Sequence, residues 1–142
     1  SFFLITLTVA SATLPAGFTE SVVASGLQSP TTMQFAPDGR LFVLEQSGRV
    51  RVIDNGALLA TPFLTLTVDA NGERGLLGIA FDPDFATNRW VYLYYTVPAP
   101  DLHNRVIRVT ANANVAAAGS APDAPVRPVG ELSSAPTHTT VT

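Results

Sequence analysis

The chain has 142 residues, of which 46% are apolar and only 13% charged, and its net charge is −3. This length and composition suffice for one ordinary domain with a core of its own. The chain has arginines but no lysine, and the arginines are spread singly along it. The sequence therefore shows no basic patch of the kind that binds nucleic acid. The chain contains no cysteine, which excludes disulfides, thiol nucleophiles and zinc-finger ligand sets.

The first twelve residues differ from the rest of the chain. Residues 2–9 form an apolar run that is too short to span a membrane, and it ends in Ala10-Ser11-Ala12. This small-x-small pattern is of the kind that signal peptidase accepts, whereas the alternative is a β-rich first strand. We interpret residues 1–12 as the remnant of a secretory signal peptide. We therefore expect a secreted or periplasmic protein with no membrane span in the mature chain.

Short strands separated by turns follow from Leu14 onward. Residues 31–35 predict a first strand, and Ala36-Pro37-Asp38-Gly39 places proline and glycine where a tight turn favours them. Residues 41–44 predict a buried second strand. Residues 49–54 alternate charged and apolar side chains with a period of two, which is typical of a strand. Residues 62–66 complete a predicted unit of four strands.

The same order of strands and turns then recurs over residues 78–109. The repeat is clearest in the turns, since Phe81-Asp82-Pro83-Asp84 echoes Phe35-Ala36-Pro37-Asp38, and the two phenylalanines lie 46 residues apart. A unit of four strands that recurs every 40–50 residues or so is typical of propeller blades. The sequence therefore predicts an all-β fold built from the first two four-stranded blades of a β-propeller.

The remaining segments set the expected limits of these blades. Residues 111–128 are rich in alanine, proline and asparagine, which favours a loop, and residues 126–132 are the predicted last strand of the second blade. We predict blade 1 at about residues 20–68 and blade 2 at about residues 74–133. Residues 13–142 would then be the N-terminal part of a propeller that is incomplete in this chain, since a closed ring needs at least about four blades.

The most specific segment is Gly72-Glu73-Arg74-Gly75-Leu76-Leu77-Gly78. A Pro83-Asp84-Phe85 turn follows it, and then the aromatic strand at residues 90–95. Over roughly residues 14–110 the chain resembles the soluble glucose/sorbosone (aldose sugar) dehydrogenases that depend on pyrroloquinoline quinone (PQQ). This resemblance implies a six-bladed propeller that holds PQQ, and often calcium, at one end of its central channel.

The resemblance also implies an oxidoreductase. Such an enzyme dehydrogenates an aldose or a related sugar alcohol group, a small-molecule substrate, and transfers hydride to the quinone. A histidine removes the proton of the sugar's C1 hydroxyl, a role that suits a neutral imidazole. The electrons then pass to an external acceptor. Most ligands of PQQ and calcium are expected outside this chain, so the fragment by itself is expected to be inactive.

Two positions match the machinery of that family. Glu73 stands where glucose-oxidising members carry a glutamine that contacts the sugar, and Arg74 belongs to the same predicted substrate or cofactor pocket. An ionised carboxylate only accepts hydrogen bonds, so the substrate preference can differ; the alternative is that Glu73 pairs with Arg74 or a neighbouring loop. His138 occupies the place of the catalytic base. Thr139-Thr140-Val141 follows it in place of Asn-Gly-Gly. His138 is the predicted base, and the alternative is that it is not the catalytic histidine.

The other polar residues have simpler interpretations. His103 is expected to be a surface or loop histidine. Asp82 and Asp84 suit calcium in principle, but their Asp-Pro-Asp sequence is better explained by turn chemistry, so no metal ligand is predicted here. Two further functions stay open beside the oxidoreductase. One is a non-catalytic secreted propeller that binds proteins or glycans, and the other is a calcium-dependent hydrolase of the lactonase type.

Overall fold

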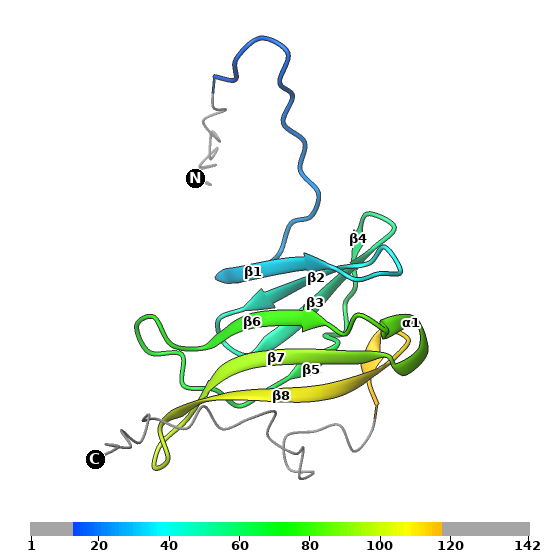
Figure 1. The fold of residues 1–142 in the computed structure, drawn as a ribbon. Helices are drawn as coiled ribbons and strands as arrows, with labels where there is room; N and C mark the ends of the chain where they lie inside the picture. Colours follow the sequence, from blue (N-terminus) through cyan, green and yellow to red (C-terminus); the bar gives the residue numbers. More distant parts are fainter. Residues whose placement is uncertain (1–12, 118–142) are drawn as a thin grey trace, which may run out of the picture.

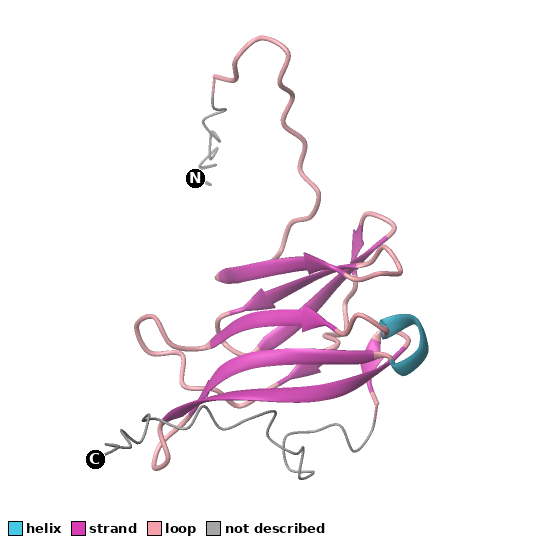
Figure 2. Ribbon diagram, viewed as in Figure 1, coloured by secondary structure: helices cyan, strands magenta, loops and turns pink. Residues whose placement is uncertain are grey.

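The structure, a computed structural model, describes residues 13–117. Residues 1–12, residues 126–132 and His138 lie outside the described residues, and so do the predictions made for them. The elements, in chain order, are β1 (Pro30–Phe35), β2 (Leu41–Glu45), β3 (Arg49–Asp54), β4 (Ala57–Leu58), β5 (Leu64–Thr65), β6 (Leu76–Phe81), α1 (Phe85–Asn88), β7 (Trp90–Val97), β8 (His103–Asn112) and β9 (Val115–Ala116). They form two stacked antiparallel sheets (Figures 1 and 2).

Tight turns set the register of the first sheet, whose order is β1-β2-β3-β4. In the β1–β2 turn the Gly39 N–H donates to the Ala36 carbonyl at 2.9 Å, and Gly39 has a φ of +91° that favours glycine. In the β2–β3 turn the Gly48 N–H donates to the Glu45 carbonyl, also at 2.9 Å. The three strands predicted over residues 31–35, 41–44 and 49–54 are confirmed as β1, β2 and β3, and they pair as two consecutive hairpins.

The outer edge of the first sheet differs from the prediction. A single fourth strand over residues 62–66 was expected, but two short strands share this edge. β4 pairs with the end of β3, and β5 pairs with its beginning. Pro62 lies between the two and has no N–H to donate to a ladder, so the pairing is interrupted and only Leu64–Thr65 remains of the expected strand.

The second sheet has the order β6-β7-β8-β9. Its centre is the long hairpin of β7 and β8, which pair from Trp90↔Thr110 to Val97↔His103. The loop predicted from residue 111 onward is wrong in its first part, because β8 continues to Asn112 and β9 follows at once. Ala111 is only 7% exposed. Its small side chain is part of the core, a role that the alanine-rich composition does not reveal.

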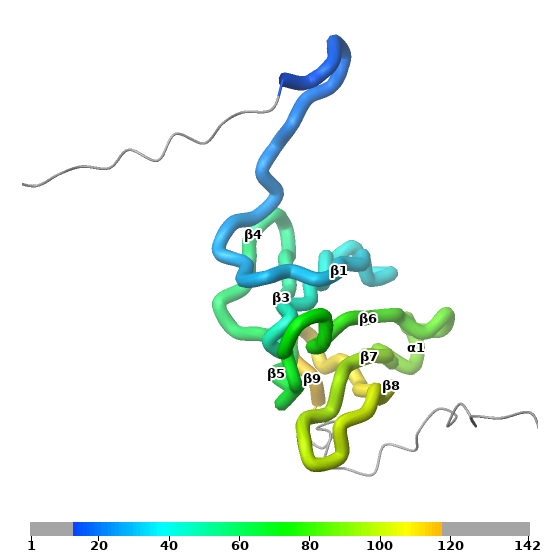
Figure 3. Tube along the Cα trace, turned by 90° about the vertical axis from the view of Figure 1, so that its left-hand side faces the viewer, coloured from blue at the N-terminus to red at the C-terminus, as the bar shows by residue number. Residues whose placement is uncertain are grey.

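The core lies between the two sheets. Phe42 of the first sheet meets Phe63 and Phe81 edge to face, with ring centroids 5.2 and 5.0 Å apart, and Phe81 meets Phe85 in the same way at 5.1 Å. Such aromatic pairs add to the apolar burial. β1 and β6 lie side by side and point in the same direction (Figures 1 and 3). Two successive antiparallel meanders stacked through their faces are the arrangement of neighbouring propeller blades, which confirms the predicted fold class.

The face of the first sheet that points away from the second sheet is only partly covered. Leu41, Val43 and Ile53 are covered there by Ala24, Leu27 and Leu58, while Met33 and Phe35 of β1 are each 67% exposed. Residues 13–29 form no strand; the first part of this segment extends away from the sheet (Figure 1), and its last part packs against the sheet through Ala24 and Leu27. No helix in the described part of the chain is long and apolar enough to cross a membrane.

Candidate functional site

The loop of residues 69–75 precedes β6 and lies at the end of the sheets opposite α1 (Figure 1). The β7–β8 hairpin reaches the same end, because the beginning of β6 pairs with the end of β7. Glu73, Arg74 and His103 therefore lie at one end of the two sheets. Whether His138 joins them is untested, since it lies beyond the described residues.

Hydrogen bonds to Asp69 fold the loop. Its carboxylate accepts from the Asn71 backbone N–H at 2.9 Å and from the Asn71 side-chain amide at 2.7 Å. It also faces Arg74, whose Nε lies 3.4 Å away. The Asn71 backbone N–H, with the side-chain amide and the nearby guanidinium, holds the pKa of Asp69 below its usual value. Asp69 therefore stays ionised and holds Arg74.

Glu73 stands at the tip of this loop. Its side chain is exposed, and within residues 13–117 it has no hydrogen-bond or ion-pair partner. Arg74 pairs with Asp69 and not with Glu73, so the pairing considered from the sequence is absent here. The carboxylate is thus free to accept a hydrogen bond from a ligand.

Both sheets hold the loop. At its two ends, the Asp69 N–H donates to the Thr96 carbonyl and the Thr96 N–H donates to the Gly75 carbonyl, each at 3.0 Å. On the side of the first sheet, the Leu76 N–H donates to the Gln46 carbonyl at 3.1 Å. Gly75 has a φ of +142°, and a Cβ there would lie 2.4 Å from the Gln46 carbonyl oxygen. Only glycine allows the loop to approach the β2–β3 turn so closely.

Beneath this end lies a buried ionic cluster that the sequence analysis missed. Glu45 is completely buried. Its carboxylate accepts from the Gln28 backbone N–H at 2.8 Å, and it pairs with Arg49 at 2.5 Å and Arg51 at 3.5 Å. The available signal was an acidic residue at the end of an apolar strand, with arginines four and six positions later. The cluster fixes the β2–β3 turn on which the loop of residues 69–75 rests.

Two of the simpler interpretations agree with the structure. His103 is exposed, with its Nδ1 against the Asp101 carbonyl and its Nε2 3.3 Å from Arg105. The carboxylate of Asp82 accepts from the Asp84 backbone N–H, from Asn88 and from the Tyr92 hydroxyl. Turn chemistry therefore accounts for Asp82. Within residues 13–117 no group of three or more ligating side chains could hold a metal ion.

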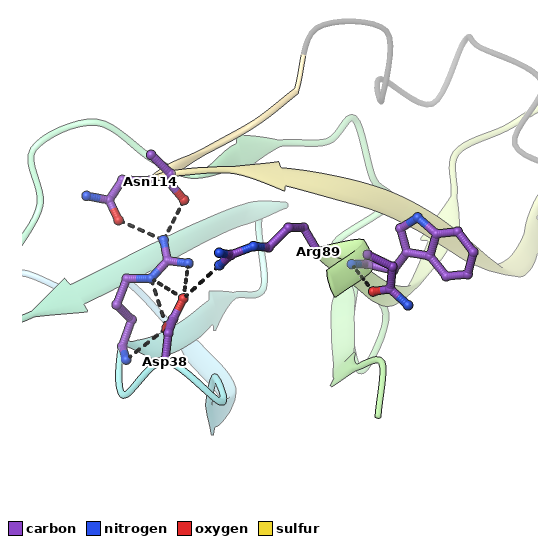
Figure 4. Close-up of polar contacts among 7 residues, drawn as sticks. Asp38, Arg89 and Asn114 are labelled. Carbon is purple, nitrogen blue, oxygen red and sulfur yellow. Dashed lines mark hydrogen bonds and ion pairs between the residues drawn. The ribbon is translucent and has the colours of Figure 1, made fainter. Parts of the chain in front are cut away.

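The far end of the sheets carries a polar cluster of a different kind, shown in Figure 4. Arg40 pairs with Asp38 at 2.6 Å and donates to Asn114 Oδ1 of the second sheet at 2.8 Å. Arg89, after α1, lies 3.9 Å from Asp38. These contacts join the β1–β2 turn to the β8–β9 turn. Because every member is engaged with another, the cluster is a tie between the sheets and not a ligand site.

We expect the Asp38→Asn substitution to cost less than about 1 kcal/mol at neutral pH, because the ion pair is partly exposed. The hydrogen bond from Arg40 holds the pKa of Asp38 below its ordinary value of 3.8. The carboxylate therefore stabilises the fold above the unfolded-state pKa, and this contribution disappears as the pH falls through the lower folded-state pKa. Urea denaturation at several pH values checks this, and an equal difference between variant and parent at pH 3 and pH 7 would contradict it.

The fold places the chain among the β-propellers. The sequence model of the family described as "Glucose / Sorbosone dehydrogenase" matches residues 27–122. That match covers more than half of the chain, so the chain belongs to the glucose/sorbosone dehydrogenase family, as the sequence resemblance indicated.

Individual relatives agree with this assignment. The chain is 33% identical over 87 residues to quinoprotein glucose dehydrogenase B of Acinetobacter calcoaceticus, covering 58% of this chain and 18% of that protein. It is 34% identical over 100 residues to the Hedgehog-interacting protein of Mus musculus, covering 61% and 14%. The PQQ-bound aldose sugar dehydrogenase of Streptomyces coelicolor matches with a TM-score of 0.57 and 33% identity, covering 65% of this chain and 27% of that one. The chain therefore spans less than a third of each of these relatives.

Proposed function

We propose that this chain forms part of a PQQ-dependent sugar dehydrogenase that oxidises an aldose or a related sugar alcohol group and transfers hydride to the quinone. The observation that carries the proposal is the loop of residues 69–75. It holds an exposed, unpaired carboxylate, Glu73, at one end of the inner strands. Family membership supplies the reaction class, and we further propose a secreted or periplasmic location, with electrons leaving to an external acceptor.

In this proposal the residues of the chain hold the sugar and move one proton. Glu73 accepts a hydrogen bond from a sugar hydroxyl and so orients the ring. His138 accepts the proton of the C1 hydroxyl, since a neutral imidazole has a suitable pKa for a general base. When bound, PQQ supplies the quinone that takes up the hydride. Thr139-Thr140-Val141 follows His138 in place of the Asn-Gly-Gly of the family pattern.

The described residues fit one edge of a PQQ site. PQQ carries three carboxylates, which favour arginine partners. Arg74 lies next to Glu73. Its buried Nε faces Asp69 at 3.4 Å, while its side chain as a whole is 43% exposed. Arg74 is therefore the residue that would face a carboxylate of PQQ. Calcium does not fit residues 13–117, which offer no set of ligands. We therefore propose calcium only with ligands from other parts of the protein.

Reconstitution of the whole protein tests this function. We expect the protein, loaded with PQQ and calcium, to reduce an artificial electron acceptor in the presence of at least one aldose from a sugar panel. Glu73→Ala should raise KM about tenfold, the loss expected for one hydrogen bond to a charged group. Absence of turnover with every sugar, in a protein that demonstrably binds PQQ, would refute the proposal.

A second candidate takes its support from one relative. The chain is 34% identical over 100 residues to the Hedgehog-interacting protein, whose name refers to an interaction with another protein. The alternative is accordingly a non-catalytic secreted propeller that binds proteins or glycans. A protein that binds no PQQ and turns over no sugar would favour this alternative.

A further inference from the structure

The side chain of Gln46 spans the gap between the two sheets. Gln46 lies in the β2–β3 turn, directly after the buried Glu45. Its Nε2 donates one hydrogen bond to the Gly72 carbonyl at 2.7 Å and a second to the Arg74 carbonyl at 2.9 Å. These are the carbonyls of the residues on either side of Glu73. One amide group therefore holds both flanks of the residue proposed to contact the sugar.

The backbone of Gln46 is equally engaged. Its N–H donates to the Ser29 carbonyl at 3.0 Å, and its carbonyl accepts from the Leu76 N–H at 3.1 Å. Gln46 thus ties the segment before β1 and the segment before β6 to the same turn. Its main chain cannot shift to follow the loop, so the position of the side-chain amide is fixed. The loop must adapt to Gln46, and not the reverse.

Within residues 13–117, no other contact at the tip of the loop could replace these two bonds. Asp69 and Gly75 are tied to Thr96, but these contacts hold only the ends of the loop. Between those ends, the Arg74 N–H donates to the Asn71 carbonyl at 3.2 Å, which is a contact within the loop itself. Gly72 has a φ of +62°, and no atom lies within 4 Å of where its Cβ would be. The tip therefore depends on Gln46 for its place relative to the first sheet.

We propose that Gln46 is the positioning residue for Glu73 and sets where its carboxylate stands in the sugar site. This inference rests on the proposed function for its kinetic consequence but not for its structural one. In this proposal Gln46 acts on Glu73 through the carbonyls of Gly72 and Arg74. A donor at position 46 is therefore required, whereas a side chain of equal length without N–H groups fails to hold the loop.

Hydrogen exchange of the whole protein without substrate tests the structural consequence. Gln46→Met keeps the length of the side chain and removes both donors, so the amides of residues 71–75 should exchange roughly tenfold faster or more. Gln46→Arg restores N–H donors within reach of two carbonyls and should return exchange toward the parent rate. Gln34→Met, the same change at an exposed glutamine of β1, is the matched control and should leave the loop unchanged.

A double-mutant cycle tests the kinetic consequence. Gln46→Met should raise KM for the sugar about threefold to tenfold while kcat changes less than about twofold. The reason is that the substitution weakens the proposed hydrogen bond between Glu73 and the sugar, which contributes to binding. In a Glu73→Ala background the same substitution should change KM by less than about twofold, because Gln46 affects KM through the Glu73 carboxylate, which is then absent. Additive effects on KM, or unchanged exchange in Gln46→Met, would overturn the proposal. If no sugar is turned over, the proposed function fails, while the exchange experiment still decides the role of Gln46.

Discussion

Glu45→Ala is expected to lower the free energy of unfolding by about 3–5 kcal/mol, the cost of removing one partner from a buried ion pair. The carboxylate is completely buried and pairs with Arg49 and Arg51. The side chain of Arg49 is 32% exposed and can turn to water, but that of Arg51 is only 11% exposed. The expected loss of stability therefore comes from the Arg51 guanidinium, which stays buried without its carboxylate partner. Urea denaturation of the whole protein measures this loss.

Two further variants separate this cause from loss of packing. Glu73→Ala removes an exposed carboxylate without a partner in the described residues and should cost less than about 0.5 kcal/mol. Arg51→Met introduced into the Glu45→Ala protein removes the stranded charge and should recover stability, so the two substitutions are strongly non-additive. Simple additivity would show that Glu45 stabilises the fold by some other route.

Gly48→Ala is the second substitution with a large expected effect, about 3–4 kcal/mol, since it combines backbone strain with a direct clash. Gly48 has a φ of +103°, and a Cβ there would lie 2.2 Å from the Leu66 carbonyl oxygen. The obstacle is backbone and cannot rotate away. The Leu66 N–H also donates to the Gly48 carbonyl at 2.9 Å, so the segment after β5 would have to leave the turn.

Gly39→Ala is the matched control for this prediction. Gly39 has a similar φ of +91°, but no atom lies within 4 Å of its would-be Cβ. It therefore bears the backbone strain alone, about 1–2 kcal/mol. Thermal or urea unfolding of both variants separates the two causes. Equal losses would mean that the clash at Gly48 is relieved at no cost, contrary to the expectation.

The repeat was predictable because its signals are local. The turn of residues 36–39 and the alternation in β3 each specify a neighbour a few residues away, so both hairpins follow from the sequence. The outer strands were less predictable. β4 and β9 have two residues each, which is too short for any periodicity. β4 pairs with β3 and β9 pairs with β8, so each short strand is determined by the longer neighbouring strand and not by a pattern of its own.

The candidate site was also predictable only in part from the sequence. Glu73 was identifiable from the segment around it, but its support was not. Gln46 lies 26 residues before Gly72, and only the stacking of two sheets brings the two together. Glu45 was equally hidden, because a charged residue at the end of a strand predicts exposure unless its partners are known. For Gln46 the missing information lies in contacts between the two sheets, whereas for Glu45 it lies in the pairing of strands within the first sheet.

The first strand of each sheet, β1 and β6, begins with a bulge, and the two bulges are not equivalent. The pairing shifts between Pro30 and Thr32 in the first sheet and between Leu76 and Gly78 in the second. The extra residue is Thr31 in one and Leu77 in the other, and the Thr31 hydroxyl donates to the Leu76 carbonyl at 2.7 Å. Leucine cannot donate such a bond. The two repeats are therefore not interchangeable parts: a protein carrying the second unit in place of the first would set a leucine against that carbonyl and leave it without its donor.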